Sequence, residues 1–152
     1  MRFSIQKNNF LTLLNEHVKV VPLRTTLPIL SCGFFGVKKN TLLLKTTNLD
    51  QTILSKTKIQ NEEEGSVSIP MNKLLEIVSA MPNEEIKITS NEDSLIEINN
   101  KQGTYKITGR STEEFPEQST ESTSEKISIP SKDLIKTIQK TTYATSKDDL
   151  KP

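Results

Sequence analysis

The chain has 152 residues, of which 33% are apolar, and its 20 basic and 19 acidic residues leave a formal net charge of +1. This length suffices for one domain of ordinary size and part of another, and the longest apolar-leaning stretch, 27–37, is too short and too interrupted for a membrane span of roughly 20 residues. The near-neutral charge also lacks the dense basic block of proteins that bind DNA tightly by neutralising phosphates.

The N-terminal segment and the cysteine content both favour a cytoplasmic protein with no membrane contact. Residues 1–8 contain no apolar core after the basic Arg2, which argues against a secretory signal. Cys32 is the one cysteine of the sequence, so an internal disulfide cannot form. Its neighbours are apolar, and we therefore expect a small buried side chain at this position.

A unit that begins with a strand and a helix occurs three times along the sequence. Residues 2–6, 67–70 and 127–130 alternate apolar and polar side chains, which is typical of a half-buried strand. Each segment leads into apolar residues at helical spacing. Pro70 and Pro130 end their strands and favour a turn into the helix, and Ser131 stands where a helix N-cap is expected.

Three further strands follow each of the first two helices. They are predicted at 33–38, 41–47 and 51–59 after the first helix, and at 85–90, 95–99 and 103–108 after the second. The sequence therefore predicts an α+β fold made of duplicated strand–helix–three-strand units, with two helices packed on antiparallel sheets in each domain.

The third unit begins and then stops, which predicts a second, incomplete domain. Residues 113–125 are rich in Ser, Thr, Glu and Pro and are typical of a linker. We expect a first domain at 1–124 and the truncated start of a second at 125–152. Because that start lacks the strands needed to cover its apolar face, we expect the chain to be a fragment of a longer protein.

The residue types needed for catalysis or for cofactor binding do not gather in the sequence. The five glycines form neither a phosphate-binding loop nor a dinucleotide fingerprint, and one cysteine with one histidine, His17, cannot build a structural zinc site. We expect His17 to be a packing or boundary residue. The carboxylates at 62–64 and 84–85 lie in turn-like contexts and are expected to be solvated. We predict no enzyme activity, no metal and no cofactor.

The helix faces opposite the apolar ones are polar and bear lysines. On the third predicted helix, Lys132, Lys136 and Lys140 recur every four residues and form a basic stripe. The corresponding residues of the first two helices are Asn8, Asn9, Thr12, Asn15 and Lys19, and Asn72, Lys73, Glu76 and Ser79. Such faces suit loose, sequence-independent contact with a phosphate backbone. The alternative is that these are ordinary solvated helix faces. Two other functions then stay open: a protein-interaction module without a DNA role, and an enzyme of unknown class.

Five segments, in order along the whole chain, carry a resemblance to a known family. They are 24–31 (Arg-Thr-Thr-Leu-Pro-Ile-Leu-Ser), 47–50 (Thr-Asn-Leu-Asp), 68–75 with its Ser-Ile-Pro and Lys-Leu-Leu, 113–116 (Glu-Glu-Phe-Pro) and 144–148 (Ala-Thr-Ser-Lys-Asp). Together they resemble the bacterial DNA polymerase III beta subunit, the sliding clamp.

This resemblance implies three similar domains per subunit and a homodimer closed head to tail into a ring. Helices would line the hole and sheets would form the outer wall, so that the ring encloses double-stranded DNA and needs only weak backbone contacts. Its implied role is a non-catalytic processivity factor that tethers the DNA polymerase III catalytic subunit and works with a clamp loader complex. The peptide groove used by these partners would lie in later domains.

The resemblance also implies particular contact residues. Arg24 matches a residue that touches DNA, and Lys147 falls in a DNA-contacting loop, although the aromatics that some relatives carry there are absent. The DNA-binding residues expected in full are Arg24, Lys73, Lys132, Lys136, Lys140 and Lys147. Asn72 stands where relatives carry a basic residue, which weakens that contact. The subunit interface is expected to use Lys73, Ile77, Gly103, Thr104, Tyr105, Lys106 and Ile107.

Overall fold

A computed structural model of the chain describes residues 1–91, 93–117 and 128–146. The chain forms two compact units, Met1–Glu117 and Gln118–Pro152. Within these described ranges, no helix is both long enough and apolar enough to cross a membrane.

The first unit contains the predicted strand–helix–three-strand order twice. The first copy consists of β1 (Arg2–Gln6), α1 (Lys7–His17), β2 (Cys32–Lys38), β3 (Thr41–Thr47) and β4 (Thr52–Lys58), with the short 3-10 helix η1 (Pro28–Ser31) before β2. The second copy consists of β6 (Gly65–Pro70), α2 (Met71–Ala80), β7 (Glu85–Ser90), β8 (Leu95–Asn99) and β9 (Thr104–Thr108). A further strand, β5 (Gln60–Glu63), joins the copies, and η2 (Thr112–Glu114) follows the second.

The two copies exchange their first strands. One antiparallel sheet has the order β4-β3-β2-β6 and the other β5-β1-β7-β8-β9. Strand β6 of the second copy thus completes the sheet of the first copy, with Phe35 opposite Val67. Strand β1 likewise joins the sheet of the second copy, with Phe3 opposite Ile88. Neither copy has a complete sheet without the other.

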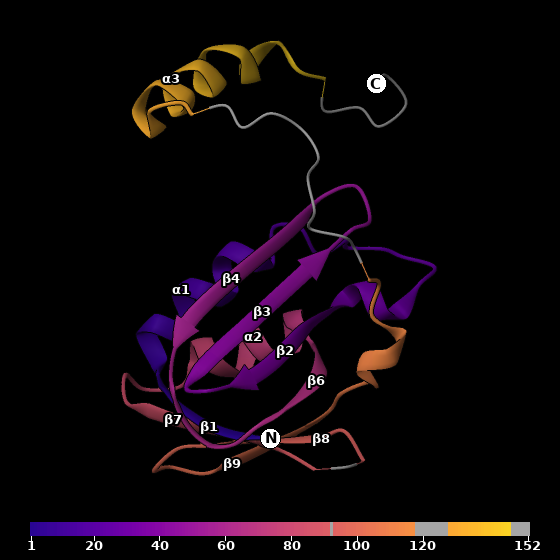
Figure 1. The fold of residues 1–152 in the computed structure, drawn as a ribbon, viewed down its shortest axis with the longest axis vertical. Helices are drawn as coiled ribbons and strands as arrows, with labels where there is room; N and C mark the ends of the chain where they lie inside the picture. The colour runs from indigo at the N-terminus through magenta and orange to yellow at the C-terminus, as the bar shows by residue number, and fades with distance from the viewer. Residues whose placement is uncertain (92, 118–127, 147–152) are drawn as a thin grey trace. The chain divides into compact units, whose positions relative to one another are not determined.

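One apolar core is shared by both sheets and both helices. The alternating residues of β2 and β3 that point inward, and the apolar residues of α1 and α2, belong to a single buried cluster. Phe10 of α1 joins the two sheets, because its ring packs edge-on against Phe3 of β1 and Phe35 of β2 at centroid distances of 6.4 Å and 6.3 Å. Helices α1 and α2 lie beside each other on the same face of the β4-β3-β2-β6 sheet (Figure 1).

The predicted turn at 62–64 is wrong, because residues 60–63 form β5. This strand pairs with β1, with Arg2 opposite Glu63. Two of its carboxylates form ion pairs with neighbouring segments. The Glu62 carboxylate lies 2.6 Å from the Lys87 ammonium, and the Glu63 carboxylate lies 3.3 Å from the N-terminal amino group. Main-chain pairing and cross-strand charge pairs therefore hold a strand that has no apolar alternation.

The predicted linker begins too early. Phe115 is buried in a second cluster with Ile29, Leu30 and Cys32, and its ring centroid lies 5.8 Å from that of Phe34. Lys45 donates a hydrogen bond from Nζ to the Pro116 carbonyl at 3.1 Å. Residues 113–117 therefore pack on the first unit. The expectation that Cys32 is buried is confirmed, and burial raises the pKa of its thiol.

In the second unit the predicted helix forms and the predicted strand before it does not. Helix α3 (Ser131–Thr141) continues into the 3-10 turn η3 (Thr142–Ala144). Residues 128–130 are not in a strand, and Ile127 lies outside the described residues. A strand needs a neighbour to pair its main chain, and the second unit supplies none among the described residues. The N-cap is Pro130 and not the predicted Ser131, which is the first helical residue.

Candidate nucleic-acid interface

Helices α1 and α2 each follow directly on a strand, and each buries one face. Helix α1 has Gln6 as its N-cap and buries Phe10, Leu14 and His17. Helix α2 has Pro70 as its N-cap, whose fixed φ of −58° suits a helix start, and it buries Met71, Leu74 and Val78. Because these buried residues recur at helical spacing, the opposite face of each helix is left toward solvent.

The polar faces predicted for α1 and α2 are confirmed except at Lys19, which lies beyond the end of α1 at His17. Every residue expected on them is exposed, namely Asn8, Asn9, Thr12, Asn15, Lys19, Asn72, Lys73, Glu76 and Ser79. The surface is mostly uncharged, and its exposed charged residues include the cations Lys19 and Lys73 and the acids Glu16 and Glu76. Such a surface can donate and accept hydrogen bonds to a phosphate backbone without binding it strongly.

Arg24 lies on an exposed loop beside the β3–β4 turn. Together with Leu27 and Leu49 it lines a hollow of about 570 Å³, and its side chain is exposed. Leu49 has a positive φ of 81°, which is unusual for a residue with a branched side chain. The guanidinium is therefore available to an anion at the edge of a turn whose backbone is strained.

The residues expected at a subunit interface come together at one edge of the first unit. Strand β9 is the outermost strand of its sheet, so no described strand pairs with one side of its main chain, and α2 packs next to it. The exposed members of this set are Lys73, Gly103, Thr104, Tyr105 and Lys106, and Ile77 is half-buried. Ile107 differs, because its side chain belongs to the core, and only its main chain can contribute to an edge contact.

The remaining predicted cations lie in the second unit. Lys132, Lys136 and Lys140 are exposed on α3 with the predicted four-residue spacing. Unlike α1 and α2, α3 buries none of its residues within the described part of the chain. Lys147 lies outside the described residues.

The sequence did not reveal the hydrogen-bonded position of His17. The ring is fully buried at the end of α1, with Nδ1 2.9 Å from Thr46 Oγ1 and Nε2 2.9 Å from Ser55 Oγ. Burial lowers the pKa of His17 to about 4, so the ring is neutral near pH 7. The expectation of a packing residue is confirmed, and the polar partners come from β3 and β4, whose register the sequence does not encode locally.

Comparisons with known proteins agree with this arrangement. The family model described as "DNA polymerase III beta subunit, N-terminal domain" matches residues 1–119. The beta sliding clamp of Staphylococcus aureus is 25% identical over 160 aligned positions, which cover 100% of this chain and 42% of that protein.

Solved structures give the same result. The Caulobacter crescentus pol III beta structure matches with a TM-score of 0.90 and 26% identity, covering 98% of this chain and 40% of that one. The DNA polymerase III subunit beta of Pseudomonas aeruginosa matches with a TM-score of 0.90 and 26% identity, covering 99% of this chain and 41% of that one. The chain thus spans about two fifths of the length of the relatives that it matches. The match to the family model, together with the fold and the repeated units, shows that the chain belongs to the DNA polymerase III beta subunit family and carries its N-terminal domain.

Proposed function

We propose that the protein carrying this chain is a DNA sliding clamp, a processivity factor that encircles duplex DNA and tethers the replicative polymerase. The observation that carries the proposal is the pairing of α1 and α2 on one face of the first unit, with a weakly charged polar surface directed away from the core. Membership of the beta subunit family supports the same role. The action is mechanical and non-catalytic, because a closed ring holds DNA by enclosure.

The DNA contacts in this proposal are few and independent of base sequence. Arg24 supplies the first, since its guanidinium suits a phosphate oxygen, and Lys73 adds a cation on α2. Lys132, Lys136 and Lys140 supply a stripe on α3, and Lys147, outside the described residues, is a further proposed contact. Weak contacts of this kind allow sliding, whereas a dense basic surface would slow it.

We further propose that the edge formed by β9 and α2 meets a second subunit in a homodimeric ring. An exposed edge strand can extend its sheet into a partner through main-chain hydrogen bonds. Lys73, Ile77, Tyr105 and Lys106 would provide side-chain contacts beside that edge, with the main chain of 103–107 pairing across it. Without such a partner, the exposed main chain of β9 could pair with edge strands of unrelated proteins.

The same proposal names the partners and the arrangement of domains. The DNA polymerase III catalytic subunit and a clamp loader complex are the expected protein partners, and a role in replication places the protein in the cytoplasm, away from membranes. We assign residues 1–124 to the first domain and 125–152 to the start of the second. Helix α3 would then be the first helix of that second domain.

Retention on DNA of different topology tests the ring. The complete protein that carries this chain is loaded by its clamp loader onto nicked circular DNA, and the bound fraction is followed before and after a single cut linearises the circle. We expect slow loss from the circle and rapid loss from the linear form, because a ring escapes only over a free end. Equal loss from both forms would contradict enclosure.

Charge reversal separates a DNA role from a protein-interaction module. Arg24→Glu combined with Lys132→Glu and Lys136→Glu is expected to lower loading on circular DNA, because the lumen would repel phosphate. Lys58→Glu is the matched control, since Lys58 is exposed at the end of β4. Unchanged loading by the triple variant would favour an interaction module without a DNA role.

A further inference from the structure

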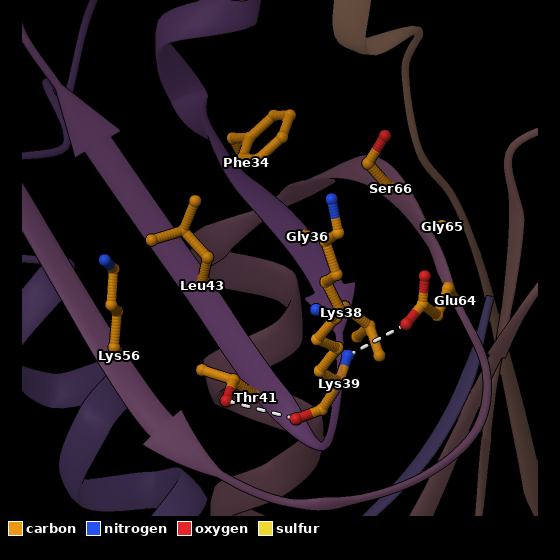
Figure 2. Close-up of a pocket in the computed structure, with 11 residues that line it drawn as sticks. Phe34, Gly36, Lys38, Lys39, Thr41, Leu43, Lys56, Glu64, Gly65 and Ser66 are labelled. Atoms are coloured by element: carbon orange, nitrogen blue, oxygen red, sulfur yellow. Dashed lines mark hydrogen bonds between the residues drawn. The ribbon is translucent and has the colours of Figure 1, made fainter.

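The face of the β4-β3-β2-β6 sheet turned away from the helices contains a hollow of about 710 Å³ (Figure 2). Successive residues of a strand point to opposite faces. Phe35, Val37, Leu42 and Leu44 are buried in the core on the helix side. Phe34, Gly36 and Leu43 therefore lie on the opposite face, where they line the hollow.

Gly36 creates the hollow, because it places no side chain at the centre of this face. In the sheet register it stands opposite Leu43 on one side and Ser66 on the other. A Cβ atom at this position would lie 3.0 Å from Cε1 of the Phe34 ring. The missing side chain leaves an apolar floor formed by Phe34, Gly36 and Leu43.

The rim of the hollow is basic. Lys38 and Lys39 come from the β2–β3 hairpin and Lys56 from β4 (Figure 2), and none of the three ammonium groups takes part in an ion pair with the described residues. The one acid in the lining is Glu64, and its carboxylate accepts a hydrogen bond from the Lys39 backbone N–H at 2.9 Å. The rim thus carries an excess of uncompensated positive charge.

We propose that this hollow, the outer-face hollow, docks a short acidic and amphipathic peptide segment of a partner protein. One large apolar side chain of the segment would lie on the floor of Phe34, Gly36 and Leu43. Carboxylates next to it would face Lys38, Lys39 and Lys56. The volume is within the range of roughly 300–1,000 Å³ that ligand sites occupy.

The apolar floor favours a peptide over nucleic acid. A phosphate backbone matches the lysines but offers no apolar group to cover Phe34 and Leu43, whereas an acidic amphipathic segment matches both the floor and the rim. The site also lies on the sheet face opposite α1 and α2. Within the first unit, the proposal therefore concerns a different surface from the helix faces proposed to contact DNA, and it does not depend on them.

Chemical-shift mapping on the 152-residue chain tests the site. The probe is a synthetic peptide in which leucine alternates with glutamate, titrated into the ¹⁵N-labelled chain. We expect amide shifts centred on Gly36, Leu43 and Lys56. Three matched probes are a peptide with lysine for glutamate, a peptide with serine for leucine, and a short DNA duplex, and each is expected to leave these amides unshifted.

Two variants separate the rim from the floor. Lys38→Glu with Lys56→Glu is expected to weaken binding of the glutamate–leucine peptide by about tenfold or more, because the rim charge is reversed. Leu43→Ser removes part of the floor and is expected to weaken binding while the rest of the spectrum stays unchanged. Lys101→Glu, an exposed lysine in the β8–β9 turn, is the control and should bind as the parent chain does.

Several outcomes would overturn the proposal. Equal shifts at Gly36 with the serine peptide would mean that the floor plays no part, and equal shifts with the DNA duplex would make the hollow a phosphate site. An unchanged Kd in the double lysine variant would remove the charge argument. Shifts centred on residues away from the sheet face would place the peptide elsewhere.

Discussion

The hydrogen bonds around His17 define which ring nitrogen carries the proton. The Thr46 hydroxyl donates to the His17 carbonyl oxygen at 3.3 Å, so its oxygen is left to accept from the ring. Nδ1 therefore carries the proton and donates to Thr46 Oγ1, and Nε2 accepts from the Ser55 hydroxyl. Protonating Nε2 would require the Ser55 hydroxyl to change from hydrogen-bond donor to acceptor and would place a charge in the core, which agrees with the lowered pKa.

His17 is expected to make the folded chain less stable in acid. Its pKa is about 4 in the folded state against 6.5 for the free side chain, so below pH 6.5 the unfolded chain takes up a proton that the folded chain does not. The stability due to neutral His17 is therefore complete above pH 6.5 and is lost as the pH falls to 4, by up to about 3 kcal/mol.

The titration can be followed directly, because His17 is the one histidine of the sequence. The Cε1–H resonance should move with a midpoint near pH 4, and urea unfolding at several pH values should show the stability loss. In His17→Gln the loss between pH 6.5 and 4 should shrink. A midpoint near 6.5 would contradict the burial argument.

Two glycines of the second copy should respond differently to the same change. A Cβ at Gly109 would lie 2.6 Å from the Ser68 carbonyl oxygen and 3.1 Å from that of Ser94, and neither backbone atom can move aside easily. We expect Gly109→Ala to lower the free energy of unfolding by about 2 kcal/mol. Gly103→Ala is the control, because nothing lies within 4 Å of its added Cβ, and it should change stability by less than about 0.5 kcal/mol. Equal effects in urea unfolding would refute the close approach at Gly109.

The β3–β4 turn holds Leu49 in a left-handed conformation through side-chain caps. Asn48 Oδ1 accepts hydrogen bonds from the N–H groups of Asp50 and Gln51 at 3.1 Å and 2.7 Å. Thr47 Oγ1 accepts one from the Leu49 N–H at 3.0 Å. With these bonds fixing the turn, the strain of a positive φ at Leu49 is retained, and the leucine side chain is 48% exposed.

Leu49→Gly is expected to stabilise the chain by about 0.5–1 kcal/mol. Glycine accepts a positive φ without steric cost, and this gain exceeds the entropy that a glycine adds to the unfolded chain. The matched control is Leu54→Gly, because Leu54 is 43% exposed but lies in β4. There we expect a loss of about 1 kcal/mol. Thermal unfolding of both variants distinguishes the effects, and a similar loss in each would show that the turn is not strained.

Sequence patterns predicted most elements, because most elements have one buried face. The strands at 41–47, 85–90 and 95–99 were predicted with the bounds that the structure has, since their alternation reflects a core on one side. Strand β5 was missed, because its stability comes from pairing with β1 and from ion pairs to Lys87 and the N-terminus. These partners are distant in sequence, and no local pattern reveals them.

Part of the candidate site could likewise be predicted from the sequence, and part could not. Exposure of the polar helix faces follows from periodicity within each helix and was predicted, whereas Arg24 lies in a loop and was singled out only by the family resemblance. The outer-face hollow and the partners of His17 depend on which residues of neighbouring strands stand opposite each other, as Gly36 does with Leu43. Register is set by the whole sheet, so a single sequence does not reveal such sites.

At the scale of the molecule, the exchange of first strands joins the two copies into one cooperative unit. Strand β1 pairs with β7 and β5, and β2 pairs with β6 and β3. Phe10 packs between the two sheets and connects them. The repeat is thus visible in the sequence as two units, whereas the smallest structure that can bury the shared core contains both.

Cutting the chain between the copies tests this dependence. Residues 1–64 lack β6 to β9, and residues 65–117 lack β1 to β5, so we expect each half alone to be unfolded by circular dichroism and by NMR dispersion. Residues 1–117 should unfold in one cooperative step.

An equimolar mixture of the halves is expected to regain native shifts, because each half supplies the strand that the other sheet lacks. Ile69→Asp in 65–117 should abolish this assembly, since Ile69 is fully buried in β6. Cooperative unfolding of residues 1–64 alone would show that the copies are independent.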